Sequence, residues 1–447
     1  MNAFHHRSWC APAILLLALD PMTRAGETVG ESRAGVSRID LPTVLRLAHA
    51  RNLDIQIARE RLAEAQANRE AAMWQAIPWV SLGVTYLNHK NLIQGVQGDV
   101  VEANKESFQA GPTTYLQLDV GDTLYKSLVT HQLVRAAKYA VAAQTQDSVF
   151  AAVQSYFDLL KAQEFTVIAR ESVDISQRYQ AETHNAVEAG IAFRVDELRV
   201  QVQTERNNLS LLQAQQNERT AATLLAQVLH LDPAVHLVAT NSDMTPLAII
   251  RDSRSLGALI AQALIARPEL GQTNALVESA NYTKKGATIG PLLPTVGGHA
   301  FTGHLGGDSD NFPSRSGGSQ DYSVGLGWRI GPGGLFDMPR IQAADARFRG
   351  ARLTAEKTRD DVIGQVVDAQ TLVVSLRSQI DQAQLALQAA EETLKLSEER
   401  KEFAVGNVLE TIQAEQDLTR ARSDYANAVA EYNKAQYALT RAVGGLK

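Results

Sequence analysis

Two short motifs in the sequence contain residues of the types that could do chemistry. The glycines of Gly325-Leu326-Gly327 and Gly331 loosely match a dinucleotide-binding fingerprint, but Pro332 follows and no acidic residue is placed for a ribose. Asp308-Ser309-Asp310-Asn311 is similar to the start of a calcium loop, but Ser319 stands where a bidentate glutamate is needed. Strand glycines explain the first motif better, and a polar external loop explains the second.

Two histidines offer a third possibility, a metal site. His299 and His304 carry suitable donor atoms, but a third ligand and a rigid spacing are missing from the glycine-rich stretch around them. The sequence has no nucleophile motif, phosphate-binding loop or His-Glu helix motif. We therefore expect no enzyme, no cofactor and no metal, and we look for the function in the elements that make up the chain.

The composition favours long helices over a compact enzyme core. The chain has 447 residues, of which 6% are aromatic, and Ala, Gln, Leu, Glu and Arg are abundant through most of it. The formal net charge is -6 and the sequence has no basic block, so a basic surface for nucleic-acid binding is excluded. The best apolar run, Ala11 to Leu19, ends within about nine residues, which is too short for a transmembrane helix. If the chain spans a membrane, strands must do it.

Residues 1–25 are predicted to be an export signal. His5, His6 and Arg7 give a basic start, an apolar run follows, and Thr23-Arg24-Ala25 offers small residues for cleavage. The alternative is a disordered amphipathic tail. Cys10 is the only cysteine and would leave with the signal, so the mature chain would have neither a disulfide nor a thiolate metal site.

A pair of long helices between Val366 and Ala442 is the clearest element of the sequence. Apolar residues recur there at alternating steps of three and four, which is the heptad pattern of a coiled coil. Phe403 to Asn407 interrupts the pattern with Gly and Asn, which tolerate the left-handed backbone of a turn. We predict an antiparallel hairpin with these seams: Val366, Ala369, Val373, Leu376, Ile380, Ala383, Leu387, Ala390 and Leu394 against Ala414, Leu418, Ala421, Tyr425, Ala428, Tyr432, Ala435, Leu439 and Ala442.

The chain is internally duplicated. A shift of about 214 residues places 190–198 on 404–412, and nearly the same shift places Ile77-Pro78 on Leu293-Pro294. We expect a first repeat at 26–230, a connector without clear period at 231–255, and a second repeat at 256–447. Each repeat should contain a helix, two strands and a long helical hairpin. In the first repeat we expect strands 79–87 and 114–120 and hairpin 124–230 with its turn near 190. In the second we expect strands 295–301 and 321–330 and hairpin 338–443 with its turn near 404–407.

The last predicted strand has the clearest membrane signature. Its apolar face consists of Tyr322, Val324, Leu326 and Trp328, and its opposite face is small and polar. Aromatic residues near both ends of an apolar strand face are typical of the surface that a transmembrane barrel presents to lipid. A half-buried strand of a soluble sheet is the alternative, but four short strands cannot build a good soluble core beside so much helix. We therefore predict that this face contacts lipid.

Taken together, these features resemble the TolC family of outer membrane efflux proteins. The resemblance rests on the duplicated plan, on Ala-Arg-Pro-Glu-Leu at 266–270 and on the turns that run into 196–198 and 410–415. It implies a mainly α fold with a small β part, in which coiled-coil hairpins form a periplasmic α-barrel continuous with a trimeric transmembrane β-barrel of four strands per chain. It also implies passive export across the outer membrane of a Gram-negative bacterium, as a homotrimer working with a periplasmic adaptor (membrane fusion) protein and an inner-membrane transporter.

The resemblance gives roles to the two hairpin turns. In the family these turns meet the adaptor, so the expected contacts are Gly190 in the first repeat and Ala404, Val405, Gly406 and Asn407 in the second. The alternative is that both glycines only reverse the chain, because glycine commonly ends helices.

The resemblance also places a lumen aperture just beyond the second turn. Glu410 matches the first of two acidic positions that ring the closed end in the family, Gln413 stands at the second, and Asp196 is the counterpart in the first repeat. A step of three keeps Glu410 and Gln413 on one helix face. The alternative is an ordinary solvated helix surface.

Two classes of function follow. One is the outer membrane channel of an efflux or type I secretion system, and the other is a periplasmic coiled-coil adaptor or scaffold without a pore. An adaptor needs one hairpin and small soluble β-domains, whereas this chain has two hairpins and lipid-facing strand patterns. The channel is therefore the favoured interpretation.

Overall fold

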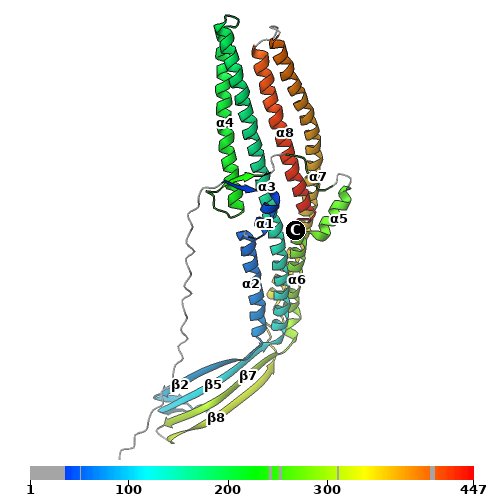
Figure 1. Ribbon diagram of the computed structural model, residues 1–447. Coiled ribbons are helices and arrows are strands. Elements are labelled where there is room, and N and C mark those ends of the chain that lie inside the picture. The colour runs from blue at the N-terminus through cyan, green and yellow to red at the C-terminus, as the bar shows by residue number, and fades with distance from the viewer. Residues whose placement is uncertain are drawn as a thin grey trace, which may run out of the picture.

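The computed structural model describes residues 36–50, 52–240, 244–250, 254–309, 312–402 and 408–446, so the predicted export signal and the turn at 403–407 lie outside it. Long helices stand on a curved sheet (Figure 1). In chain order the helices are α1 (Leu41–Ala50), α2 (Leu53–Trp74), α3 (Val120–Glu188), α4 (Arg194–Val228), α5 (Leu256–Ala266), α6 (Pro268–Thr288), the short 3-10 helix η1 (Gly290–Leu292), α7 (Met338–Glu402) and α8 (Val408–Ala442). Among the described helices, none is long and apolar enough to cross a membrane.

The two longest helices connect the sheet to the far end of the molecule (Figure 1). α3 has 69 residues and α7 has 65, so at about 1.5 Å per residue each extends on the order of 100 Å. Near the sheet, α3 packs against α2 and α6, and α7 packs against α6. Toward the far end each packs against its own return helix, α4 or α8. No single globular core is this long, and the apolar side chains are distributed along helix seams instead.

The predicted heptad seam of the second hairpin is confirmed. Val366, Val373 and Ile380 of α7 lie in one buried cluster with Tyr432 and Leu439 of α8. On α8, buried alanines fill alternate positions of this seam, so the backbone of α7 can approach closely while the large side chains interdigitate.

Four long strands form one antiparallel sheet in the order β2-β5-β7-β8. Because β5 belongs to the first repeat and β7 to the second, the two repeats join in the middle of this sheet. All the strands are β1 (Val36–Ile39), β2 (Trp79–His89), β3 (Leu92–Gln94), β4 (Val100–Glu102), β5 (Lys105–Asp119), β6 (His236–Ala239), β7 (Thr295–Ser309) and β8 (Phe312–Gly327).

The four strands differ in length from the predicted ones. The glycine- and serine-rich stretch between the last two predicted strands, 303–320, was expected to be a loop, but residues 303–309 and 312–320 continue the sheet, with Gly303 opposite Ser319 and Gly307 opposite Arg315. Small polar side chains on both faces give no alternating signal, although backbone pairing still holds such strands together. β8 ends at Gly327 and not at 330, because Trp328 lies beyond it and its indole N–H donates to the carbonyl of Leu292 at 3.1 Å.

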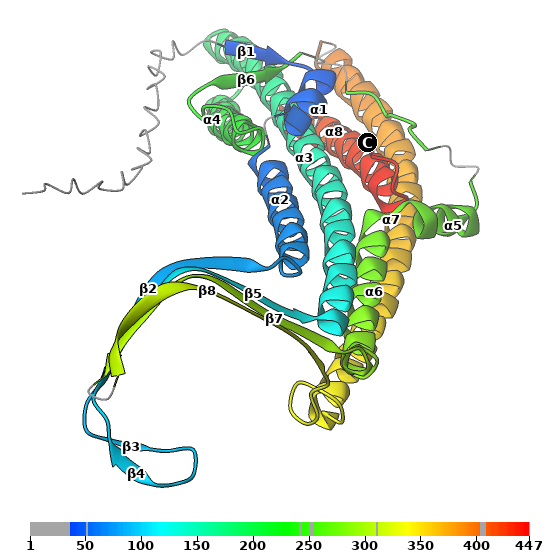
Figure 2. The ribbon, with the colours of Figure 1, turned by 90° about the horizontal axis from the view of Figure 1, so that it is seen from below.

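The connector contains a strand that the sequence pattern did not reveal. β6 pairs in parallel with β1, and Figure 2 shows this two-stranded sheet beside α1 and α4. Ile39 of β1 and Leu237 of β6 are buried in one cluster with Val153 of α3 and Leu225 of α4. The connector therefore belongs to the core of the first hairpin at mid-height.

The second hairpin crosses the start of α6 at a buried arginine. Arg267 donates to the side chain of Gln365 at 2.8 Å and to the carbonyl of Arg441 at 3.3 Å, and it lies 2.9 Å from Glu269. Burial lowers the pKa of Arg267, and the carboxylate of Glu269 opposes this effect. Gln365 is on α7 and Arg441 on α8, so one side chain connects both helices of the hairpin to α6.

Overall, the predicted fold class is confirmed in its main features. The chain is mainly helical with a small sheet, and a helix, two strands and a long helical hairpin occur twice along it. Figure 2 shows that the sheet curves away from the helices as an arc.

Candidate functional site at the hairpin ends and the sheet

The first hairpin turns at Gly190. This residue has a φ of +73°, its N–H donates to the carbonyl of Val187 at 3.0 Å, and the N–H of Ile191 donates to Ala186 at 2.9 Å. These two bonds form a Schellman cap, in which a left-handed residue ends the helix. The backbone therefore requires glycine for the chain reversal, which is one of the two roles considered from the sequence.

The turn after Gly190 carries exposed apolar side chains. Ile191 is 82% exposed and Phe193 is 77% exposed, and Val195 follows at the start of α4. Sequence reasoning singled out the glycine and missed these neighbours, although apolar residues within a turn are themselves a signal. The other expected contact residues, Ala404, Val405, Gly406 and Asn407, lie outside the described residues.

A groove runs between α4 and α8 just behind the first turn. Its apolar lining is Val195, Leu198 and Val202 from α4 with Leu409 and Ile412 from α8. Arginine and glutamine side chains border it, namely Arg199, Gln203, Arg206, Gln413 and Gln416. The two hairpins thus present one shared apolar surface near their ends.

The acidic residues expected at the aperture are both ion-paired within their own hairpin. The carboxylate of Glu410, in the first turn of α8, lies 2.6 Å from the guanidinium of Arg400 on α7. Asp196 lies 3.3 Å from Arg199 one turn along α4. Gln413 is exposed. A ring of three Glu410 side chains would therefore carry an equal number of arginine charges beside it.

A second acidic residue near the first turn is more enclosed. Glu197 is buried and accepts from His184 at 2.9 Å, while Arg194 pairs with its other oxygen. The hydrogen bond from His184 lowers the pKa of Glu197, with Arg194 adding to the effect, and the same bond raises the pKa of His184. This pair fastens α4 to the end of α3.

The contact between the two hairpins is polar. Along it, α3 and α8 pair Lys161 with Glu431 at 2.8 Å and Glu171 with Arg422 at 2.5 Å. Lys434 pairs with Asp158, and hydroxyls of Ser172 and Thr419 lie 2.7 Å apart. Between the hairpins, Tyr179 of α3, Val200 of α4 and Ile412 of α8 form one small apolar cluster.

One face of the sheet is apolar and exposed. On β8, Tyr322 is 86% exposed and Leu326 is 68% exposed, with Val324 between them, and Leu82 and Val84 of β2 are similarly open. The antiparallel registers place these residues on one side of the sheet, while Ser323 and Gly325 are on the other. Trp328, expected on the same strand face, lies beyond the end of β8. A soluble surface rarely has so large an apolar face.

The candidate metal ligands do not converge. His299 and His304 are five residues apart on β7, so they lie on opposite faces; His299 packs against Tyr115 at 5.1 Å and His304 against Phe108 at 6.1 Å between ring centroids. Within the described part of the chain, no group of three acidic, histidine or cysteine side chains is arranged to hold a metal ion.

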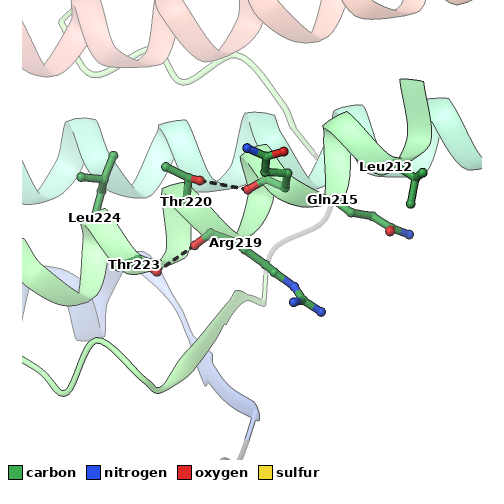
Figure 3. Close-up of a pocket in the computed structure, with 7 residues that line it drawn as sticks. Leu212, Gln215, Arg219, Thr220, Thr223 and Leu224 are labelled. Carbon is green, nitrogen blue, oxygen red and sulfur yellow. Dashed lines mark hydrogen bonds between the residues drawn. The ribbon is translucent and has the colours of Figure 1, made fainter. Parts of the chain in front are cut away.

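The residues that line a shallow hollow along α4 also form no catalytic or metal-binding group (Figure 3). Leu212 and Leu224 are exposed in it, and the hydroxyls of Thr220 and Thr223 donate to carbonyls of their own helix. Arg219 extends away from the helix in this view. The hollow belongs to a single helix face, and apolar side chains line part of it.

Comparisons with known proteins agree with this arrangement. The family model described as Outer membrane efflux protein matches residues 44–229 and 259–445. Protein CyaE of Bordetella pertussis is 28% identical over 319 residues, which are 70% of this chain and 65% of that relative. The match thus spans less than two thirds of the relative.

Solved structures share the fold. The Campylobacter jejuni CmeC outer membrane channel superposes with a TM-score of 0.77 at 17% identity, covering 91% of this chain and 85% of that one. The outer membrane protein VceC of Vibrio cholerae superposes with a TM-score of 0.75 at 16% identity, covering 91% and 96%.

Proposed function

The chain belongs to the outer membrane efflux protein family, and from this premise we propose that it is the exit channel of a tripartite export system. As a member of this family it is a non-enzymatic protein of the Gram-negative outer membrane whose helices extend into the periplasm. In the proposed role, an inner-membrane transporter and a periplasmic adaptor deliver substrate, and the channel supplies a passive duct. The alternative of a pore-free adaptor is set aside, because the family model covers both repeats.

The exposed apolar face of the sheet carries the proposal. Strands β2 and β8 are the two edges of that sheet, and their outer backbone groups are unpaired. In lipid an unpaired backbone group costs several kcal/mol, so the edges must pair with strands of other copies. A homotrimer closes the sheet with three identical edge contacts, and the exposed leucines of α4 in Figure 3 would then pack against a neighbouring copy.

Two arginine substitutions on β8 test this orientation. Leu326→Arg places a charge on the lipid side and should cost about 2–4 kcal/mol near the midplane. Gly325→Arg is the matched control, because it lies on the opposite face and a Cβ atom added there meets no atom within 4 Å. We expect native gels of outer membrane extracts to show loss of trimer for Leu326→Arg only. Equal loss for both variants, or recovery of the parent as a soluble periplasmic monomer, would contradict the proposal.

We further propose that the groove between α4 and α8, together with the turns at Gly190 and at 404–407, receives the adaptor. Leu198 and Val202 are exposed in the groove, and a helix with an apolar face would cover them. Leu198→Lys should abolish cross-linking to a co-expressed adaptor while trimer yield stays normal. Gln213→Lys, at an exposed position of α4 outside the groove, is the control. Normal cross-linking of Leu198→Lys would remove the groove from the contact.

The cargo class follows from the transporter. A wide, wet duct makes few specific contacts, so small-molecule efflux and type I secretion use similar channels. Purification of the tagged channel after mild cross-linking should recover one inner-membrane transporter, and its class decides between the two.

A further inference from the structure

One buried carboxyl group lies where three helices meet and takes part in none of the ion pairs described above. Glu415 of α8 is 3% exposed. It accepts a hydrogen bond from the amide of Asn207 on α4 at 3.0 Å, and the same amide donates to the carbonyl of Ser172 on α3 at 3.1 Å. Glu415 is therefore part of the contact between the first hairpin and the second.

The amide of Asn207 is held in one orientation. Its oxygen accepts from Gln203 at 2.9 Å while its nitrogen donates to the two partners on α3 and α8. A neutral carboxylic acid at Glu415 keeps this bond, because its carbonyl oxygen still accepts from Asn207. An ionised carboxylate keeps it too, but it brings a charge into a site without a cationic partner in hydrogen-bond reach among the described residues.

Charged groups do surround the site at a greater distance. A cavity of about 490 Å³ beside Glu415 is lined by Arg178, Tyr179 and Glu182 from α3 and by Glu398 from α7. Arg178, Glu182 and Glu398 are exposed, so water screens their fields. Burial raises the pKa of Glu415 to about 7, and the Asn207 bond opposes this rise only in part.

We propose that Glu415 makes the contact between the two hairpins depend on pH, so that the neutral carboxyl holds the hairpins together and the ionised one lets them part. The direction follows from proton binding. A carboxyl of ordinary pKa 4.5 that titrates near 7 in the closed contact binds its proton more tightly when closed than when open. The closed contact is therefore favoured most at pH values below 4.5. It progressively loses this advantage as the pH rises through about 7.

Thiol labelling at the contact measures this effect. Ser172 is 6% exposed and bonds to Thr419 across the hairpins, so Ser172→Cys is labelled only when the contact opens. When reclosing is faster than labelling, the rate follows the equilibrium population of the open state. The reference is the same cysteine with Glu415→Gln, which cannot ionise, in detergent-purified trimer. We take the ratio of the labelling rate with Glu415 to the rate with Glu415→Gln. The titration of the thiol affects both rates equally, as does that of His184, whose pKa is raised within the first hairpin, so neither changes the ratio.

The labelling ratio should rise about tenfold between about pH 6 and about pH 8, because the open carboxyl is already ionised there while the closed one keeps its proton until the pH reaches about 7. Glu171→Gln, an exposed carboxyl of the same contact, should leave the rise unchanged. Ser279→Cys, buried on α6 away from the contact, should show no rise. If Glu415→Gln does not assemble, Glu415→Met provides the neutral reference. A flat ratio for Ser172→Cys, or an equal rise at Ser279→Cys, would overturn the proposal.

Discussion

The two contacts of α8 differ in kind. Toward α7, it buries a continuous apolar seam in which Val429, Tyr432 and Leu439 are almost fully covered. Toward α3, it presents Arg422, Glu431 and Lys434, which form ion pairs across the contact. Apolar burial is insensitive to salt and pH, whereas exposed and half-buried ion pairs contribute little and respond to both. The second hairpin is thus built as a firm unit that is joined to the first by an adjustable contact.

The largest expected effect tests the firm contact. Leu439→Ala should destabilise the second hairpin by about 2–5 kcal/mol, because a buried leucine leaves a cavity that the neighbouring helices fill only in part. Leu439 is 2% exposed, and the exposed Leu385 of α7 is the matched control, where the same change should stay within about 0.5 kcal/mol. Denaturant unfolding followed by circular dichroism gives both values. Similar small losses at the two sites would mean that the seam is not the main source of stability.

Removing an ion pair from the contact between α8 and α3 should destabilise the protein less. Lys434→Ala removes the partner of Asp158 and Glu431, and we expect a loss of about 1–2 kcal/mol, since half-buried charge-assisted bonds lie between surface pairs and fully buried ones. A double-mutant cycle with Asp158→Ala isolates the pair. A coupling as large as the Leu439 effect would erase the distinction between the two contacts.

Salt should separate the contacts without any substitution. Raising sodium chloride from about 0.05 M to about 0.5 M shortens the Debye length, which weakens the attraction within the ion pairs between α3 and α8. Apolar burial is left intact. Labelling of Ser172→Cys should therefore accelerate several-fold, while a buried cysteine in the apolar seam, at Ala435, should not respond. Equal acceleration at both positions would indicate general loosening.

The smallest effect concerns the charges near the second turn. Because Arg400 pairs with Glu410, a ring of three such pairs around the lumen would be nearly neutral, and Glu410→Gln should shift a single-channel reversal potential toward anions. Arg400→Gln should shift it toward cations, with each free charge worth about 0.8 kcal/mol at 5 Å in water before screening. Unchanged potentials in both variants would remove these side chains from the lumen.

Sequence patterns predicted the features that depend on long periods. The heptads of α7 and α8 and the repeat of 214 residues extend over many turns, so single exceptions did not hide them. Short or unpatterned elements were missed: β6 has four residues, and the outer halves of β7 and β8 are rich in glycine and serine. Their position depends on backbone pairing with distant strands, which leaves no trace in local side-chain order.

The candidate site was predictable only in part. The turn at Gly190 and the apolar face of β8 followed from residue type and alternation. The pairing of Glu410 with Arg400, ten residues earlier on another helix, and the burial of Glu415 depend on how the hairpins pack. Neither is visible in a single heptad, because a glutamate beside an apolar stripe is normally solvated.

The buried Arg267 has a mechanical consequence. It fixes α7 at Gln365, and from there the helix runs unbroken to Glu402. At about 1.5 Å per residue this part of α7, which is packed against α8, is about 55 Å long, and a stiff rod that pivots by about ten degrees moves its end by about 10 Å. A modest change of angle at this guanidinium would thus be magnified at the tip, as in a lever.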